Sequence, residues 1–337
     1  MKQDPEMIEL FKSELQLCQV REGEKVAVLS AGDSLRSYAD TFMQAARQLG
    51  AQALDVHLPA AAETEGLKDY GKNRLGEDKK AMEALKSADM VIDLLVASFS
   101  AEGDEIQRAG ARVLLVCEEL EALKRMFPTA EHRQRTEASS RRLAAARTLR
   151  FTNRAGTDVT YKFGNRYKPL IEYGYTADPG RWDHWPAGLV CNCADDVNGR
   201  VVMDEGDIVY PTMKFLSEPI EFEIEAGYVR RIKGGREADE MRRWMDSYED
   251  PRAYAVSHVG WGTHTGAQWS ARGIGMDGRS LYGSVLWSLG PNLEFGGDND
   301  TACHMDLPMR HCSVWLDGEK VIGNGRILPD ELRAPGF

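Results

Sequence analysis

The first 147 residues alternate between strand patterns and helix patterns, and this alternation limits the possible folds more than any other feature of the chain. Helical spacings separate the strand patterns, and one of these helical stretches ends at Gly50. Strands that alternate with helices form βαβ units with right-handed crossovers, and such units build a mostly parallel sheet. We therefore expect an α/β domain over residues 1–147. Its strand patterns lie at 25–30, 51–56, 89–95 and 112–116.

The pattern changes after a long polar helical stretch that ends near residue 148. From there to residue 337 the segments are shorter and rich in glycine, aromatic and β-branched residues, and acidic residues beside glycines indicate hairpins. One helical pattern at 237–248 interrupts them. We expect an α+β domain over residues 148–337, dominated by antiparallel strands. Its strand patterns lie at 157–163, 200–203, 207–210, 220–224, 228–233, 285–289, 303–307, 313–316 and 319–322.

The charge of the chain excludes several kinds of partner. With 42 Lys and Arg against 53 Asp and Glu, the net charge is 42 − 53 = −11. Nucleic acids and anionic membranes attract clustered basic residues, so we expect neither as a partner. No apolar run is long enough for a membrane span, and the N-terminal segment does not resemble a signal peptide. We therefore expect a cytoplasmic protein whose six scattered cysteines are thiols.

The segment from Cys303 to Cys312 carries the most specific chemical pattern. In a strand, His304 and Asp306 would point the same way, because side chains alternate between the two faces. A second histidine would complete the two-histidine, one-carboxylate triad of non-haem Fe(II) oxygenases, which leaves three positions open on the metal. The best candidate is His258, since the glycines that flank Trp261 nearby permit close backbone approach or an unusual φ, as a site loop often needs. Taken alone, the pair also fits a half-buried strand whose histidine bonds a neighbour.

A second cluster lies upstream, around His184. Trp185 follows this histidine, and two indoles could form the walls of a slot for a flat ring while His184 transfers protons. Glu172 lies in an aromatic, strand-like stretch and could orient His184 or accept a substrate proton. A buried aromatic corner and a solvated glutamate are the alternatives. Three arginines, Arg272, Arg279 and Arg310, could each meet an anionic substrate group, and each could instead be a surface or ion-pair residue. We expect His132 to be solvated on its helix.

In order along the chain, these motifs resemble those of the 2,5-dihydroxypyridine 5,6-dioxygenases. Members of this family are Fe(II) enzymes that open a ring in nicotinate-type degradation, and they share a fold with leucyl aminopeptidases of the aminopeptidase T type. The resemblance runs nearly end to end, from Val26–Ser30 to Leu328. The motifs that carry it are Glu172-Tyr173-Gly174-Tyr175, Asp178 to Pro186, Ser257 to Gly262, Gly290-Pro291-Asn292 and Cys303 to Cys312.

The resemblance implies roles for individual residues. The iron ligands of the family fall on His258, His304 and Asp306, and its acid/base histidine and nearby glutamate fall on His184 and Glu172. Where the pyridine-cleaving members have a histidine, this chain has Phe99 at about that place. An apolar side chain there would change the wall of the site, in the same subunit or in a neighbouring one. We therefore expect Phe99 and Trp185 to bind the substrate ring.

Comparison with the peptidases of the same fold separates the two chemistries. The resemblance places Leu189 and His258 where the peptidases have metal-binding glutamates, and Leu286 near a metal-binding histidine. Two hydrolytic metals are therefore hard to build from this chain.

The sequence thus predicts a mononuclear non-haem Fe(II) extradiol-type dioxygenase. Its substrates would be O₂ and a small N-heteroaromatic ring such as 2,5-dihydroxypyridine or a close analogue, and its assembly a homo-oligomer. For 2,5-dihydroxypyridine, the resemblance implies N-formylmaleamate as the product. A metallo-aminopeptidase or other hydrolase on the same fold and a non-catalytic metal-binding protein are the alternatives, and the same triad can hold Mn²⁺.

Overall fold

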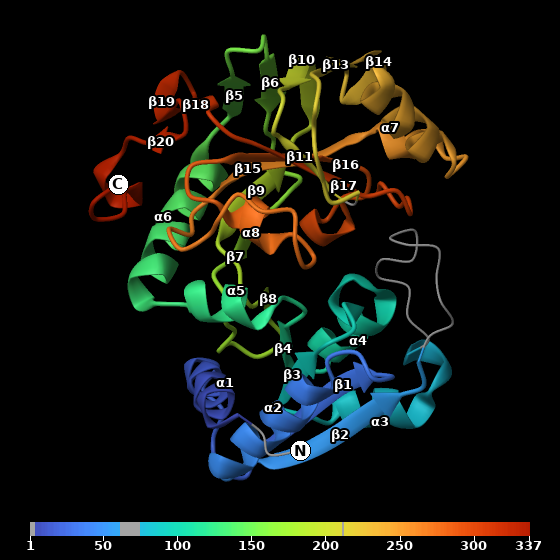
Figure 1. Cartoon of the computed structure of the whole chain (residues 1–337), viewed down its shortest axis with the longest axis vertical. Helices are drawn as coiled ribbons and strands as arrows, with labels where there is room; N and C mark the ends of the chain where they lie inside the picture. The colour runs from blue at the N-terminus through green and yellow to red at the C-terminus, as the bar shows by residue number, and fades with distance from the viewer. Residues whose placement is uncertain (1–3, 61–74, 211) are drawn as a thin grey trace. The chain divides into compact units, whose positions relative to one another are not determined.

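The chain folds into two compact units, each described here by itself (Figure 1). The computed structural model describes residues 4–60, 75–210 and 212–337. Unit 1 consists of Met1–Pro128 and Tyr173–Ala187, and unit 2 of Thr129–Glu172 and Gly188–Phe337. This division differs from the predicted boundary at residue 147, because the long polar helix belongs to unit 2 and a later segment returns to unit 1.

Unit 1 is built on a parallel five-stranded sheet, as the alternating pattern predicts. The sheet has the strand order β2-β1-β3-β4-β8, and all four neighbouring pairs are parallel. The last strand, β8, comes from the returning segment and pairs with β4. The elements are α1 (Pro5–Leu17), β1 (Lys25–Ala31), α2 (Arg36–Gln48), β2 (Gln52–Leu58), α3 (Lys79–Lys86), β3 (Met90–Asp93), α4 (Ala101–Arg108), β4 (Arg112–Leu115), α5 (Leu120–Arg125) and β8 (Trp182–His184).

Helices cover the sheet of unit 1 because its strands are apolar on both faces. In β1, Ala27 and Leu29 join one hydrophobic cluster with residues of α3 and α4, whereas Val26 and Val28 point to the opposite face. Helix α2 ends where predicted, since Gly50 has φ of +79°, a left-handed conformation that glycine adopts without strain.

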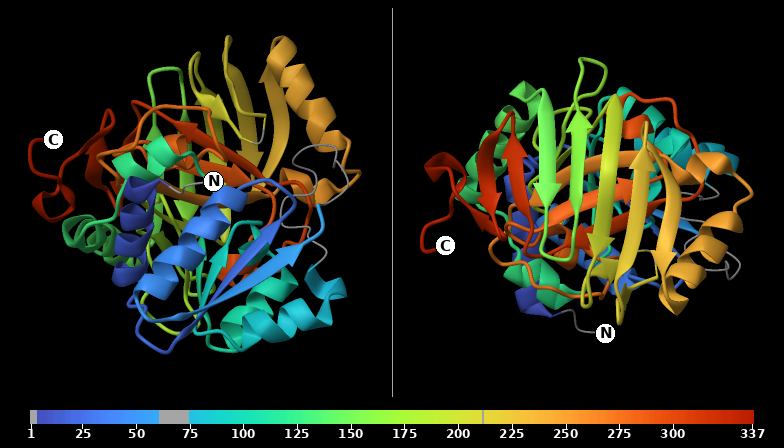
Figure 2. Two further views of the ribbon diagram at one scale, coloured as in Figure 1. Left: turned by 60° about the horizontal axis from the view of Figure 1, so that its bottom comes forward. Right: turned by 90° about the horizontal axis from the view of Figure 1, so that it is seen from above.

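Unit 2 contains two large antiparallel sheets, and its described residues also form three α-helices and three short 3-10 segments. Eight strands are in the order β14-β13-β10-β6-β5-β18-β19-β20, and five are in the order β17-β16-β15-β9-β7. Figure 2, in its right panel, shows the eight-stranded sheet with β19 and β18 in red toward one end and β14 beside α7 toward the other. The antiparallel arrangement of this half is as the sequence predicts.

Where the sequence predicts a strand or helix in unit 2, the observed bounds agree within a few residues, whereas β5, β7, β9, β12, β15, β20 and α8 were not among the predicted segments. The helices are α6 (Ala130–Ala145), α7 (Arg236–Asp246) and α8 (Met276–Ser280). The strands are β5 (Thr148–Thr152), β6 (Asp158–Lys162), β7 (Leu170–Glu172), β9 (Leu189–Cys193), β10 (Asp196–Met203), β11 (Ile208–Val209), β12 (Lys214–Phe215), β13 (Ile220–Glu225), β14 (Tyr228–Gly234), β15 (Val256–Gly262), β16 (Val285–Leu289), β17 (Met305–Met309), β18 (Ser313–Leu316), β19 (Glu319–Gly323) and β20 (Arg326–Ile327).

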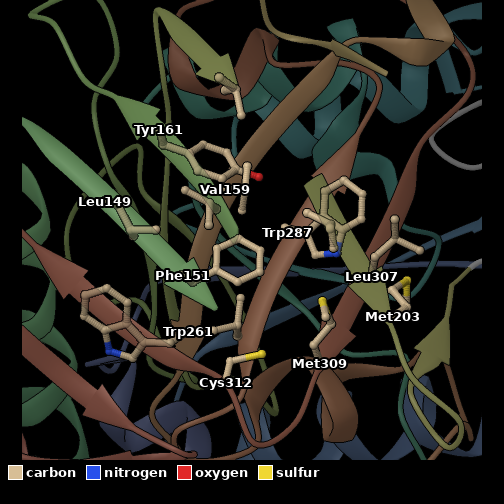
Figure 3. Close-up of a cluster of buried hydrophobic side chains, with 14 of the residues drawn as sticks. Leu149, Phe151, Val159, Tyr161, Met203, Trp261, Trp287, Leu307, Met309 and Cys312 are labelled. Carbon is tan, nitrogen blue, oxygen red and sulfur yellow. The ribbon is translucent and has the colours of Figure 1, made fainter. Parts of the chain in front are cut away.

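The core of unit 2 is formed by side chains from both large sheets. Phe151 and Tyr161 come from the eight-stranded sheet, and Trp261, Trp287 and Leu307 come from the five-stranded sheet (Figure 3). All five are buried within one hydrophobic cluster. Because side chains alternate along a strand, the residues between these core positions lie on the other face of the five-stranded sheet.

Within the described ranges, no helix is both long and apolar enough to cross a membrane.

Candidate metal centre

The face of the five-stranded sheet that points away from the core carries the predicted ligands. In β15, Val259 and Trp261 enter the core, so His258 points to the opposite side. In β17, Met305 and Leu307 enter the core, so Asp306 points to that same opposite side. His304 directly precedes β17. Because it lies two residues before Asp306, its side chain points to the same face of the sheet.

A β-bulge aims His258 at its neighbours. The register between β15 and β16 shifts between Val256 and Val259, so β15 has one extra residue there. The N–H of His258 donates to the hydroxyl of Ser288 at 3.0 Å, which satisfies the amide that the bulge takes out of the ladder. Bulges turn a side chain toward a new direction and are frequent near functional sites. Residues 257–262, whose glycines are also typical of a site loop, lie within strand β15.

Of the two roles that the sequence offered for the glycines of that segment, close backbone approach and an unusual φ, the structure shows the first at Gly260. A Cβ at Gly260 would lie 1.8 Å from the carbonyl oxygen of Val190 on β9, so only glycine allows the two strands to approach this closely.

The structure brings the three predicted ligands together. Nε2 of His258 lies 3.3 Å from Oδ1 of Asp306, and Nε2 of His304 lies 3.3 Å from Oδ2 of the same carboxylate. The two imidazole rings are 6.0 Å apart between centroids, and Phe295 lies 5.2 Å from the ring of His258. Each of the two imidazoles therefore lies beside a different oxygen of the Asp306 carboxylate.

Arg279 also contacts this carboxylate, through an ion pair of 2.7 Å between its Nε and Oδ2 of Asp306. Burial alone would raise the pKa of Asp306, but the charges of Arg279 and His304 outweigh it and hold the pKa well below its usual range. Burial likewise works to lower the pKa of His304, but the charge of Asp306 and its hydrogen bond with the imidazole together raise this pKa above its usual value. Asp306 is thus an anion ready to accept a cation.

The donor set fits a divalent metal, although the side chains are not fully arranged for one. In the described part of the chain, no three His, Cys, Asp or Glu side chains stand ready to hold a metal ion. The oxygen nearest His304, Oδ2 of Asp306, is also paired with Arg279. Two ligands at right angles, each about 2.1 Å from a metal, are about 3 Å apart. The 3.3 Å between Nε2 of His258 and Oδ1 of Asp306 is close to this value, so these two atoms lie at a separation that suits two ligands of one metal.

Glu172 belongs to the same sheet face as His258. It ends β7 and lies opposite Leu189 of β9, whose face also carries Cys193, the cross-strand partner of His258. The side chain of Glu172 is buried. Burial raises the pKa of the Cys191 thiol, and the negative charges of Glu172 and Asp306 raise it further, so both carboxylates act on this thiol. The solvated alternative for Glu172 is therefore excluded, and its catalytic role stays a prediction.

His184 lies in unit 1, at the end of β8, and its placement depends on Asp183. This carboxylate is fully buried and accepts hydrogen bonds from the N–H groups of Tyr173, Gly174 and His184. It also forms an ion pair of 2.6 Å with Arg181. His184 is therefore held at the carboxyl end of a parallel strand, where α/β folds place their ligands. Because Glu172 belongs to unit 2, its pairing with His184 stays a prediction.

Trp185 is completely buried in unit 1, with its ring 5.6 Å from that of Phe11 and 5.9 Å from that of Phe127. This is the buried aromatic corner that the sequence left open as an alternative, and contact with a substrate ring stays a prediction. The backbone of Phe99 ends a short 3-10 helix, Ala97–Phe99, and its side chain lies outside the described atoms.

Sequence reasoning missed the role of one residue of the centre, Arg279, and predicted the wrong environment for another residue of unit 2, His132. Arg279 was one of several possible anion-binding arginines, and the missing signal was its proximity to Asp306, which depends on the tertiary fold. His132 was expected to be solvated, but it is buried, with its Nε2 3.3 Å from the hydroxyl of Thr263 and its ring 4.3 Å from that of His264. The prediction failed because most residues of α6 are polar, although one of its faces is buried.

Comparisons with known proteins agree over nearly the whole chain. A sequence model of the family described as 2,5-dihydroxypyridine 5,6-dioxygenase matches residues 6–329. A 2,5-dihydroxypyridine 5,6-dioxygenase from Pseudomonas putida is 38% identical over 344 aligned positions, covering 98% of both chains. The solved structure of a 2,5-dihydroxypyridine dioxygenase from P. putida has a TM-score of 0.92 and 37% identity, and the match covers 97% of this chain and 98% of that one.

A more distant structure shares the fold alone. Wild-type AmpT from Thermus thermophilus has a TM-score of 0.62 at 14% identity, over 96% of this chain and 99% of that chain. The predicted aminopeptidase T-like architecture is thereby confirmed.

Proposed function

Because the chain belongs to the family of 2,5-dihydroxypyridine 5,6-dioxygenases, we propose that it opens the ring of 2,5-dihydroxypyridine or a close analogue with O₂. The observation that carries the site assignment is the convergence of His258 and His304 on the carboxylate of Asp306, each at 3.3 Å. Membership in a dioxygenase family supports a metal cofactor, a small aromatic substrate and O₂ as reactants.

We propose that the metal is Fe(II) and that His258, His304 and Asp306 hold it. Two neutral imidazoles and one carboxylate suit Fe(II) and leave three positions for other ligands. When bound, Fe(II) supplies a Lewis acid and a route for electrons from the ring to O₂.

His184 and Glu172 would move the protons of the reaction. A histidine titrates near neutral pH and would take the proton of a ring hydroxyl, then return it as the ring opens. The position of His184 at the carboxyl end of β8 and the buried carboxylate of Glu172 support these roles. Trp185 and Phe99 remain our candidates for the walls of the ring slot.

The overall reaction is balanced without a further reductant. Both atoms of O₂ enter the product, and two ring atoms become the carbonyl groups at the two ends of the break. With 2,5-dihydroxypyridine as the substrate, the product would be N-formylmaleamate. A cytoplasmic location and a homo-oligomeric assembly stay predictions from the sequence.

The hydrolase alternative has little support from the sheet face. Leu189 and Leu286 are buried, and the alternation of β9 and β16 puts them on the same face as His258. Leucines supply no ligand for a second hydrolytic metal. The likeness to AmpT, at 14% identity, extends to the fold only.

An oxygen-uptake assay tests the proposal. The protein is reconstituted with Fe(II) without air and then given O₂ with a panel of hydroxypyridines. We expect uptake of one O₂ for each 2,5-dihydroxypyridine consumed, and with ¹⁸O₂ a product that carries both labelled atoms. Absence of oxygen consumption with every member of the panel, or peptide hydrolysis without O₂, would contradict it.

A further inference from the structure

Arg279 is held in place by several groups besides Asp306. Its Nη1 donates to the carbonyl oxygen of Ile274 at 2.6 Å, and its guanidinium carbon lies 4.4 Å from the centre of the Tyr210 ring. The hydroxyl of Tyr210 in turn donates to the carbonyl oxygen of Ser270 at 2.7 Å. Arg279 is only 9% exposed. A planar guanidinium fixed on an aromatic face has little freedom to change its direction.

The ring under Arg279 is tied to the proposed ligand itself. Tyr210 and Asp306 exchange backbone hydrogen bonds of 3.0 and 3.1 Å, so the two residues lie directly side by side. The segment that carries Arg279 passes tightly over this ring. A Cβ at Gly275 would lie 2.4 Å from Cε1 of Tyr210, and one at Gly278 would lie 2.4 Å from its hydroxyl oxygen. Two glycines therefore allow the close approach that brings Arg279 to the carboxylate.

The two oxygens of Asp306 have different surroundings as a result. Each oxygen faces the Nε2 of one histidine at 3.3 Å, Oδ1 that of His258 and Oδ2 that of His304. Oδ2 alone is also paired with Nε of Arg279, at 2.7 Å, among the described residues. A carboxylate can bind a metal through one oxygen or through both. An oxygen that stays paired with a guanidinium has less electron density and less freedom for a second bond to a metal.

We infer that Arg279 is a positioning residue that keeps Oδ2 of Asp306 from the metal, so that the carboxylate binds through Oδ1 alone. This inference rests on the proposed function. A carboxylate that binds through one oxygen leaves three positions on a six-coordinate ion for the substrate and O₂, whereas one that binds through both leaves two. Since a guanidinium stays protonated at every accessible pH, the pairing does not depend on pH in the working range.

Substitution of Arg279 gives an unusual combination of effects. In Arg279→Gln, the freed Oδ2 would join the metal and a nearby positive charge would be lost. The expected result is Fe(II) binding that is unchanged or up to about tenfold tighter, together with a kcat lower by about tenfold or more. Arg279→Lys retains the charge near Oδ2 and should recover part of the kcat. A substitution that only loosened the fold would weaken Fe(II) binding and activity together.

The experiment uses the full chain, with Arg310→Gln as the matched control. Arg310 also lies over an aromatic ring, 4.8 Å from the centre of Trp269, but it forms no ion pair with Asp306 among the described residues. Fe(II) affinity is measured without air by competition with a coloured chelator. Co(II), bound in place of Fe(II), reports coordination through its visible absorption. We expect the Co(II) spectrum to change in Arg279→Gln and to match wild type in Arg310→Gln.

Three outcomes would overturn the inference. Two of them remove only the positioning role of Arg279, and the third also removes the proposed function. A Co(II) spectrum of Arg279→Gln identical to wild type, or Fe(II) binding weakened by more than about tenfold, removes the positioning role alone. A wild-type protein that binds no Fe(II) removes the proposed function as well. Binding, kcat and spectrum are thus read from the same set of variants.

Discussion

Replacing Asp183 by asparagine should weaken the hydrogen bonds that fix the backbone at His184, while the Fe(II) affinity of the proposed ligands stays nearly unchanged. Asp183 has no exposed surface, and its pair with Arg181, itself 21% exposed, measures 2.6 Å. Asparagine keeps one acceptor oxygen for the three backbone N–H donors but turns an NH₂ group toward the guanidinium. Losing one charge-assisted bond and opposing two donors costs about 2–4 kcal/mol.

This free energy converts into a rate of hydrogen exchange. Since about 1.4 kcal/mol is a factor of ten, the amides of residues 173–184 should exchange roughly 30 to 1,000 times faster in Asp183→Asn. Exchange is followed by mass spectrometry on peptides of this segment. In the same variant kcat should fall, because His184 loses its fixed position. Fe(II) affinity should stay within about twofold, because the three ligands belong to unit 2.

Asp158→Asn is the matched control, since it breaks an Asp–Arg pair of similar length on the surface. Asp158 pairs with Arg150 at 2.7 Å, and the two side chains are 53% and 49% exposed. Such a pair contributes about 0–1 kcal/mol, so exchange should change little. Equal exchange in the two variants would refute the reasoning that burial makes the Asp183 pair important. A large loss of Fe(II) affinity in Asp183→Asn would refute the separation of the two roles.

Two further predictions concern unit 2. Trp287→Ala should lower the free energy of unfolding by about 3–5 kcal/mol, because Trp287 is fully buried against Phe222 with ring centroids 5.1 Å apart; Trp315→Ala, at a half-buried position, should cost clearly less in the same urea titration. Burial raises the pKa of Asp207 to about 6, whereas an unfolded aspartate titrates near ~3.9. The folded protein thus binds the extra proton between about pH 4 and pH 6, so the contribution of Asp207 to stability falls as the pH rises through this window. Asp207→Asn should remove this dependence, and an unchanged pH profile of stability would contradict the assignment.

The sequence predicted those parts of the fold that depend on local patterns. The strand at 285–289 and the end of α2 at Gly50 follow from periodicity and from a glycine that stops a helix. The return of β8 to the sheet of unit 1 was not predictable in this way. It is only three residues long, and its pairing with β4 bridges a long separation in sequence.

The candidate site was predictable to the same degree. Period-two alternation placed His304 and Asp306 together, and the motifs of the resembling family added His258. The bulge that aims His258 and the contact of Arg279 with Asp306 arise from tertiary packing, so no spacing in the sequence marks them. The glycines at 260 and 262 suggested either a close backbone approach or an unusual backbone conformation, and only the packing of β15 against β9 decides for the close approach at Gly260.

An anaerobic Fe(II) titration tests the central claim most directly, with wild type compared against His258→Ala, His304→Ala and Asp306→Asn. Chelator-treated wild type should bind one Fe(II) per chain and regain oxygen uptake with 2,5-dihydroxypyridine in proportion to the iron bound. Each variant should lose most of the binding and the activity, since loss of one of three ligands leaves an incomplete site. Full Fe(II) binding by His258→Ala, or oxygen uptake by chelator-treated wild type, would contradict the claim.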